Sequence, residues 1–150
     1  MVFQRETLFD VIDEVQPLLE SHHAEVAPAS AVIRLEPQWG NYAELERMGL
    51  YVVFTCRVKG ALVGYGGFFL STHLQHGVKV ANNDLIYLVP ESRKGTNAVK
   101  FIDFCETQLK ALGAQTITYH VKLKHDWRPI LNRRGYSDEE VAVVKIIQGE

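Results

Sequence analysis

The sequence predicts an α/β domain built on a mixed sheet, and three observations predict it. Runs of β-branched and aromatic residues at 50–58 and 61–74 flank a Lys59-Gly60 turn, which is typical of a hairpin. A short apolar strand, a loop and a long amphipathic helix then follow over residues 85–112. Alternating helical and β patterns continue to the end of the chain, an order typical of α/β domains.

The composition is that of one globular domain spanning residues 1–150. Hydrophobic residues make up 47% of the chain and charged residues 23%. The net charge of −2 argues against direct nucleic-acid binding, which needs a basic excess. Acidic residues interrupt the apolar N-terminal stretch, and no apolar run approaches the roughly 20 residues of a membrane span. We therefore expect a cytoplasmic protein with no membrane partner.

The two cysteines, Cys56 and Cys105, both lie in apolar runs. A disulfide framework in a short secreted chain uses more cysteines than this. We expect both to be reduced thiols in the core.

The N-terminal third is predicted to be helical. Thr7 can cap a first helix, Asp10 stands three residues later, and the helix should end near Ser21. Residues 28–40 contain prolines and little periodicity, which indicates a loop, and a short helix should follow at 41–48. The apolar positions of the first helix are Leu8, Val11, Ile12, Val15, Leu18 and Leu19.

The second half alternates strands and helices. Helical periodicity is strongest in the segment that Gly113 ends, and Gly135 ends a shorter helix. The predicted elements are a strand at Leu85–Val89, a loop at 90–95, a helix at Thr96–Leu112, and then a strand at 115–121, a helix at 126–134 and a final strand at 141–147.

The segment that carries chemistry is the loop that opens the long helix. The first turn of a helix has unpaired N–H groups and a partial positive charge, and a preceding loop can add its own N–H groups around an anion. Arg93 and Lys94 place two positive charges there, and Thr96 adds a hydroxyl. The pattern predicts a phosphate site, with an ordinary basic surface loop as the alternative. It is not a Walker loop.

The segment LIYLVPESRKGTNAVKFIDFCETQLKALGAQTITYHV resembles the central motif of GNAT N-acyltransferases. In that family a strand leads into a loop of the form Arg/Gln-x-x-Gly-x-Gly/Ala and then a long helix. Arg93 and Ala98 match the ends of this motif, whereas Thr96 stands where the first glycine is usual. The residues from His125 to Gly135-Tyr136 resemble the last helix of the family, and HLQHGVKVANNDLIYLVPESR resembles its phage and prophage members. The resemblance covers about residues 50–147.

The resemblance implies the GNAT fold, with a mostly antiparallel sheet flanked by helices, and acetyl-CoA as cosubstrate. The main chain of Leu88 and Val89 would pair with the pantetheine arm and bond the acetyl oxygen. An amine would attack the thioester directly. Leu131 occupies the position where many members have a tyrosine that protonates the thiolate, so that acid is missing here. The loop residues that would hold the pyrophosphate are Arg93, Lys94, Gly95, Thr96, Asn97 and Ala98.

Three residues are candidates for accepting the proton of the amine. Asp84 is expected at the start of the strand that faces the acetyl group, although Asn83-Asp84 also resembles a turn. His73 lies on the long hairpin arm and His120 within the strand at 115–121, and both titrate in a useful range. Each has the alternative of an ordinary surface or core role.

Two functions remain open from the sequence. One is an N-acetyltransferase that acts on a primary amine of a small molecule or protein. The other is a weak or inactive protein of the same fold that binds a host or phage macromolecule, favoured by Leu131 and Thr96. We expect no metal site, because the adjacent His22 and His23 cannot readily face one ion. A homodimer is left open.

Overall fold

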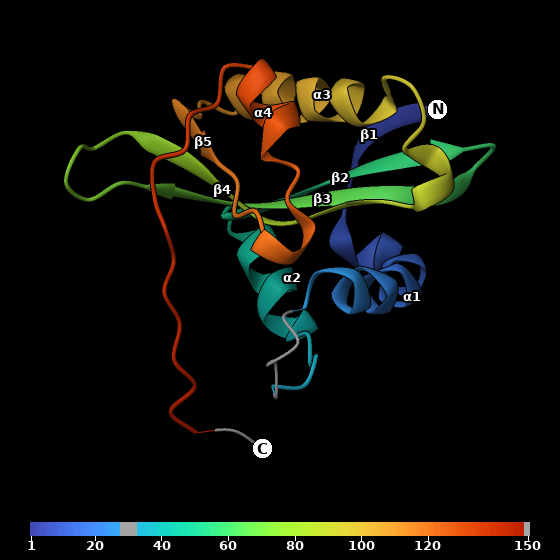
Figure 1. Ribbon diagram of the computed structural model, residues 1–150, viewed down its shortest axis with the longest axis horizontal. Coiled ribbons are helices and arrows are strands. Elements are labelled where there is room, and N and C mark those ends of the chain that lie inside the picture. Colours follow the sequence, from blue (N-terminus) through green and yellow to red (C-terminus); the bar gives the residue numbers. More distant parts are fainter. Residues whose placement is uncertain (28–32, 149–150) are drawn as a thin grey trace.

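The computed structural model describes residues 1–27 and 33–148. A five-stranded sheet lies between two layers of helices, with α1 and α2 on one face and α3 and α4 on the other (Figure 1). Residues 28–32, the start of the predicted loop, and residues 149–150 lie outside the described part. The elements are β1 (Val2–Glu6), α1 (Leu8–Val26), α2 (Trp39–Arg47), β2 (Tyr51–Val58), β3 (Ala61–Thr72), β4 (Lys79–Leu88), α3 (Asn97–Ala111), β5 (Thr116–Thr118) and α4 (Arg128–Arg133).

The strands lie in the sheet in chain order, β1-β2-β3-β4-β5. All neighbours are antiparallel except β4 and β5, which run parallel, so the sheet is mixed and mostly antiparallel, as predicted. β2 and β3 form the predicted hairpin. Its turn residues Lys59 (φ 50°) and Gly60 (φ 83°) have the two positive φ angles that suit the twist of the strands.

Helix α1 packs on the sheet through one apolar stripe. It begins after Thr7, as predicted, but the Thr7 hydroxyl donates to Asp10 (2.6 Å) and caps no backbone N–H. The N–H of Leu8 instead donates to the carboxylate of Glu46 on α2 (3.0 Å), a charge that suits a helix N-terminus. The buried stripe consists of Leu8, Val11, Val15, Leu19 and His22.

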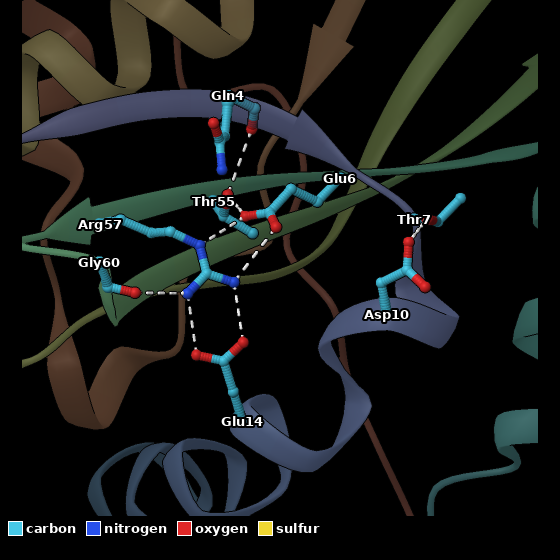
Figure 2. A network of polar contacts seen from close by, with 8 residues as sticks. All are labelled: Gln4, Glu6, Thr7, Asp10, Glu14, Thr55, Arg57 and Gly60. Carbon is cyan, nitrogen blue, oxygen red and sulfur yellow. Dashed lines mark hydrogen bonds and ion pairs between the residues drawn. The ribbon is translucent and has the colours of Figure 1, made fainter.

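A charged network ties α1 to the first two strands (Figure 2). Arg57 on β2 donates to Glu6 on β1 (Nε to Oε2, 2.9 Å) and to Glu14 on α1 (Nη2 to Oε1, 2.8 Å). It also donates to the carbonyl of Gly60 (2.8 Å), and the Thr55 hydroxyl donates to Glu6. The hydrogen bond from Arg57 lowers the pKa of Glu6 from 4.5 to about 2. The network fixes the N-terminal strand and the helix that follows it.

Helix α3 covers the opposite face of the sheet. Phe101 and Cys105 of α3 pack with Phe54 and Phe68 of the strands, and all four are at most 2% exposed. Cys56 and Cys105 are both buried free thiols, as predicted, and burial raises the pKa of each. Within residues 1–27 and 33–148, no helix combines the length and apolar character needed to cross a membrane.

Several boundaries differ from those predicted. Residues 2–6 form a strand that the sequence did not indicate, because pairing with β2 stabilises a segment with little pattern of its own. α1 continues past Ser21 to Val26, since His22 extends its buried stripe. β4 begins at Lys79 and not at Leu85, so Asp84 lies inside this strand and the prediction that it begins the strand was wrong. β5 and α4 are shorter than predicted.

The predicted final strand at 141–147 was also wrong. This segment has no regular secondary structure and pairs with no strand of the described part. In Figure 1 it runs from α4 past β5 and away from the body of the protein. Its sequence has the composition of a strand, but a strand also needs a partner. The most exposed of its apolar side chains, each at least 85% exposed, are Val141, Val143, Val144 and Ile147.

Candidate functional site

Strand β4 contains a β-bulge at Asp84. Asn83 and Leu85 pair with the consecutive β3 residues Phe68 and Gly67, so Asp84 between them has no partner on β3. A bulge of this kind inserts one residue and interrupts the alternation of side chains along the strand. As a result, Asp84 and Leu85 both lie toward the α1 and α2 side of the sheet.

Two tyrosines hold the carboxylate of Asp84. Tyr42 of α2 donates to Oδ2 at 2.7 Å, and Tyr51 of β2 donates to the same oxygen at 3.0 Å. Burial and the neighbouring carboxylate raise the pKa of both tyrosines, so both remain protonated donors. Asp84 is therefore a half-buried carboxylate that two neutral hydroxyl groups keep in one orientation.

Asn83 and Gly67 make the bulge possible. The side-chain amide of Asn83 donates to the carbonyls of Gly67 (3.2 Å) and Leu85 (2.9 Å), which satisfies polar groups at the irregular point of the ladder. Gly67 lies against the end of the Tyr51 side chain, where a Cβ would stand 1.9 Å from the tyrosine oxygen. The missing side chain at Gly67 thus lets Tyr51 reach Asp84.

Beyond the bulge, β4 has an open edge. β5 ends opposite Asn82. From there β4 continues to Leu88, and on the side away from β3 no further strand of the described part of the chain lies next to it. The N–H of Val89 donates to the carbonyl of Val63 on β3 (2.8 Å), and hydrogen-bonded pairs alternate along an antiparallel ladder. The main-chain groups of Ile86 and Leu88 therefore point to the open edge, where an extended ligand with amide groups can pair.

A mostly apolar cavity of about 190 Å³ lies against this edge. His22 lines it from α1, with Nδ1 3.0 Å from the Tyr65 oxygen and its ring stacked on Tyr87 at a centroid distance of 4.9 Å. Burial lowers the pKa of His22 to about 4, so the imidazole is neutral near neutral pH. The lining residues are His22, Glu25, Val26, Ile86, Tyr87, Leu88, Arg93, Ala98, Phe101, Ile102, His125, Trp127 and Ile130.

The side chain of Arg93 is turned back toward the protein. Its Nε donates to the carbonyl of Leu88 (2.7 Å), and Nη1 and Nη2 each lie 2.8 Å from the carboxylate of Glu25 on α1. The guanidinium also lies 5.4 Å from the centre of the Tyr87 ring, and His125 stands 3.2 Å from Glu25. The hydrogen bond from Arg93 lowers the pKa of Glu25, so the pair stays charged. Arg93 thus joins the end of β4 to the end of α1.

The predicted strand, basic loop and long helix follow one another in the structure. Gly95 has a φ of +62°, and the side chain of Asn97 donates to the carbonyl of Ser92 (3.0 Å), which fixes the turn into α3. The first N–H groups of a helix have no partners within it, and they favour an anion. Lys94 is exposed beside them. The phosphate site at this loop stays a prediction; Lys94 is exposed to solvent, whereas the guanidinium of Arg93 is paired with Glu25.

A second hollow, of about 350 Å³, lies on the α1 and α2 side of the sheet. Trp39 and Tyr42 of α2 line it with Leu85, the residue after Asp84. The rings of Trp39 and Tyr42 lie 5.8 Å apart, and Trp39 Nε1 donates to Gln16 of α1 (3.0 Å). Because Tyr42 both lines this hollow and binds Asp84, the hollow adjoins the carboxylate.

The structure separates the three predicted proton carriers. His73 lies at the turn between β3 and β4, stacked on His76 at 4.6 Å. β4 begins after this turn at Lys79, and Asp84 lies five positions farther along the strand, roughly 17 Å away. His120 is exposed, two residues beyond the end of β5. Of the three, Asp84 lies next to the open edge, and all three roles stay predictions.

Leu131 is buried on α4, at 4% exposure. An apolar side chain at this position has no proton to donate. Within the described residues, no group of three or more His, Cys, Asp or Glu side chains is arranged to hold a metal ion. The titratable side chains beside the open edge include Asp84 and, in the lining of the cavity, His22, Glu25 and His125.

Sequence analysis missed three residues of this site. His22 continues the helical spacing of Leu8, Val11, Val15 and Leu19. This spacing would have indicated His22 if the predicted helix had been extended by one turn. Tyr42 and Tyr51 carried no comparable signal. Tyr51 belongs to an apolar run and Tyr42 to the short helix α2, and only the bulge brings Asp84 to their hydroxyl groups.

No protein-family model matches the sequence, and no curated protein matches it. Solved structures are similar in fold at low sequence identity. The ribosomal-protein-alanine N-acetyltransferase of Brucella melitensis biovar Abortus 2308 is 18% identical with a TM-score of 0.67, over 97% of this chain and 100% of that one. A predicted acetyltransferase of Clostridium acetobutylicum, solved with acetyl-CoA, is 13% identical with a TM-score of 0.72, over 97% and 96% of the two chains.

An aminoglycoside acetyltransferase from an uncultured soil metagenomic sample, solved in complex with sisomicin, is 13% identical with a TM-score of 0.71. The match covers 99% of this chain and 95% of that one. Identities this low establish the architecture and leave the chemistry to be argued from the site. With its five-stranded mixed sheet between layers of helices, the chain has the α/β fold of GNAT acetyltransferases.

Proposed function

We propose that this chain is an N-acetyltransferase that transfers an acetyl group from acetyl-CoA to a primary amine by direct attack. The observation that carries the proposal is the open edge of β4, which runs from the bulge at Asp84 to the loop at 93–98. A ligand that matches this surface is extended, bears amides along its length and ends in phosphates. Coenzyme A has this form. The solved complex of the Clostridium acetobutylicum protein with acetyl-CoA supports the same choice.

In this proposal the two ends of the open edge hold different parts of the cosubstrate. The N–H groups at the start of α3 and the ammonium of Lys94 bind the pyrophosphate, with Gly95 and Thr96 in the turn between them. Leu88 and Val89 border the pantetheine arm, and Leu88 supplies the main-chain groups. The N–H of Ile86, two residues nearer the bulge, donates to the acetyl oxygen and so polarises the carbonyl.

Arg93 acts as a positioning residue and not as a direct phosphate ligand. Its guanidinium is occupied by Glu25 and by the carbonyl of Leu88. By binding both groups, Arg93 holds the loop at 93–98 at a fixed distance from the open edge of β4. The carbonyl oxygen of Leu88 already accepts a hydrogen bond from Arg93 Nε. A pantetheine amide that donates to this carbonyl either shares the oxygen with Arg93 or displaces it.

Asp84 is the proposed acceptor of the amine proton. It lies two residues, roughly 7 Å along the strand, from Ile86. The hollow next to Tyr42 gives the amine a path from the α1 and α2 side. The carboxylate first holds the ammonium form and then removes a proton, directly or through one water, so that the neutral amine can attack the thioester carbon. Positioned proton transfer of this kind contributes roughly 10²–10⁴ in rate.

The thiolate that leaves needs no side-chain acid. A thiol has a pKa near 8.5, so its anion is a weak base and water can protonate it. This allows turnover with a leucine at position 131. The same leucine is the observation that favours the second function, a protein that keeps the fold and acts by binding another macromolecule.

Calorimetry and turnover assays with acetyl-CoA test the two halves of the proposal. Lys94→Glu reverses a charge beside the pyrophosphate and should weaken coenzyme A binding at least tenfold, about 1.4 kcal/mol. Lys110→Glu makes the same change near the other end of α3 and serves as the matched control, with affinity expected to stay within twofold. Equal effects of the two variants would place the pyrophosphate elsewhere.

Asp84→Asn should reduce kcat on a panel of primary amines while coenzyme A affinity stays unchanged. His22→Gln is the comparison, because His22 lines the cavity but has a pKa of about 4. Full kcat in Asp84→Asn together with a large loss in His22→Gln would move the proton acceptor to His22. Binding of coenzyme A with no turnover on any amine would favour the binding protein.

A further inference from the structure

The second hollow, next to Asp84, is lined mainly by apolar side chains. Trp39 and Tyr42 of α2 form an aromatic wall, with ring centres 5.8 Å apart. Leu19 of α1 and Leu85 of β4 line the hollow beside them. The other apolar lining residues are Ile33, Leu35 and Pro37. A ligand that fills this space must itself be largely apolar, because a polar body would lose its water without gaining partners.

The aromatic wall is fixed before any ligand binds. Trp39 Nε1 donates to Gln16 of α1 at 3.0 Å, and the Tyr42 ring stacks on Phe69 of β3 at a centroid distance of 6.2 Å. The Tyr42 hydroxyl is held by Asp84 at 2.7 Å. Aromatic rings pair at centroid distances of about 4.5–7 Å. A further ring can therefore pack against this wall with little loss of side-chain entropy in the protein.

One oxygen of Asp84 is left for a ligand. Tyr42 and Tyr51 both donate to Oδ2, whereas Oδ1 accepts no hydrogen bond from residues 1–27 and 33–148. An ammonium group can donate to Oδ1, and a hydrogen bond between two charged groups is stronger than one between neutral groups. The Asp84 end of the hollow therefore suits one ammonium group.

The rest of the hollow does not suit a second charge. The charged residues of its lining are Arg34 and Glu36, both exposed. Their charges are opposite, so together they give a second ammonium group no net attraction. A carboxylate on the carbon next to the amino group would stand beside Asp84 and be repelled by it. The site thus matches a ligand with a single positive charge.

We propose that the acceptor is an apolar primary monoamine, in which a short chain joins the amino group to an aromatic ring. This assignment rests on the acetyl transfer proposed above. The ring packs against Trp39 and Tyr42, and the ammonium donates to Oδ1 of Asp84. Asp84 takes one proton, the neutral nitrogen bonds to the acetyl carbon, and the C–S bond breaks. The second nitrogen proton passes through water to the thiolate, which gives an N-acetyl amide and free coenzyme A.

Tryptophan fluorescence tests binding separately from turnover, with phenethylamine as the probe. The chain has two tryptophans: Trp39 lines the second hollow, and Trp127 lines the cavity beside the open edge of β4. Phenethylamine, added in the presence of coenzyme A, should shift the emission to shorter wavelength because its ring displaces water from Trp39. Trp127→Phe should keep this shift and Trp39→Phe should lose it. The reverse pattern, or no shift at millimolar phenethylamine, would overturn the assignment.

Turnover of matched amines tests the predicted preference. Phenethylamine should have a kcat/KM at least about tenfold above that of ethylamine, which lacks the ring. Putrescine, with two amino groups, and phenylalanine, with a carboxylate, should be as poor as ethylamine. Equal values for phenethylamine and ethylamine, or a preference for putrescine, would refute the assignment while leaving acetyl transfer intact.

A variant that changes the charge of the hollow gives a test that does not depend on how well the protein folds. Leu35→Glu adds a carboxylate to the lining, so the ratio of kcat/KM for phenethylamine to that for putrescine should fall at least about fivefold. Met48→Glu, at an exposed apolar position outside the lining, is the matched control and should leave the ratio unchanged. An unchanged ratio in Leu35→Glu would contradict the assignment. Binding at Trp39 without acetylation of any amine would instead refute the acetyl transfer on which it rests.

Discussion

Replacement of Gly67 by alanine should disrupt the link between the bulge and its tyrosine. The added methyl group would stand 1.9 Å from the Tyr51 oxygen and 2.8 Å from its Cζ. Carbon atoms in proteins pack at about 3.5–4.0 Å, so the Tyr51 ring must move by more than about 1 Å. The hydrogen bond from Tyr51 to Asp84 is 3.0 Å long, and this movement breaks it.

The expected loss of stability follows from two terms. Overpacking a buried site costs about 1–3 kcal/mol. Losing a hydrogen bond to a charged group costs about 1.5–3 kcal/mol. We therefore expect the free energy of unfolding to fall by about 3 kcal/mol or more, which in a domain of this size lowers Tm by about 6–12 °C. Turnover should fall as well, because Asp84 loses one of the two groups that orient it.

Urea unfolding followed by circular dichroism measures this change, and the neighbouring Gly66 provides the control. A Cβ at Gly66 would meet its nearest atoms, on Phe101 and Phe68, at 3.4 Å, an ordinary contact. Gly66→Ala should therefore change stability by less than about 1 kcal/mol. The cost of Gly67→Ala should also shrink in a Tyr51→Phe background, by about 1–2 kcal/mol.

A stability for Gly67→Ala within about 1 kcal/mol of wild type would refute this reasoning. So would an equal cost of the substitution in the wild-type and Tyr51→Phe backgrounds. Either result would mean that Tyr51 does not pass over Gly67 to Asp84.

Two further predictions concern charge and hydrogen bonding away from the site. The pKa of Glu6 is lowered to about 2, so its contact with Arg57 stabilises the fold above about pH 4.5 and is lost as the pH falls from there toward 2. Arg57→Leu should therefore destabilise the protein near neutral pH, and its difference from wild type in urea midpoint should shrink in acid, where the hydrogen bond to the Gly60 carbonyl remains. Tyr119→Phe should raise the free energy of unfolding by about 1 kcal/mol, because the buried Tyr119 hydroxyl has no hydrogen-bond partner among the residues that the structure describes. Tyr136→Phe should lower it, because that hydroxyl donates to Glu106 (3.0 Å), and thermal melting of the two variants in parallel checks the opposite signs.

The sequence predicts the elements whose patterns are local. The β2–β3 hairpin follows from β-branched runs and one glycine turn, and α3 follows from helical spacing that ends at Gly113. Neither needs information from the rest of the chain. The loop before α3 belongs to the same group, because its chemistry depends on consecutive residues, Arg93 to Asn97.

The parts that sequence analysis missed depend on contacts between distant residues. Asn83-Asp84 has the composition of a turn, and it becomes a bulge inside β4 because the Asn83 amide reaches Gly67 on β3. The direction of Arg93 depends on Glu25, which is 68 residues away. The segment at 141–147 is the opposite case. Its local pattern predicts a strand, but the segment has no strand to pair with in the described part of the chain.

The first four strands follow one another across the sheet in the order in which the chain is synthesised. The turns that join β2, β3 and β4 are short, so the pairing of these three strands can advance one strand at a time and should be fast, whereas β1 reaches β2 only across α1 and α2. β5 differs, because it joins by a parallel crossover and by only three residue pairs. Amide hydrogens of β5 should therefore exchange with solvent sooner than those of β2 and β3. If β5 exchanges first, the space beside β4 can widen for the proposed cosubstrate while the pairing of β2 with β3 stays intact.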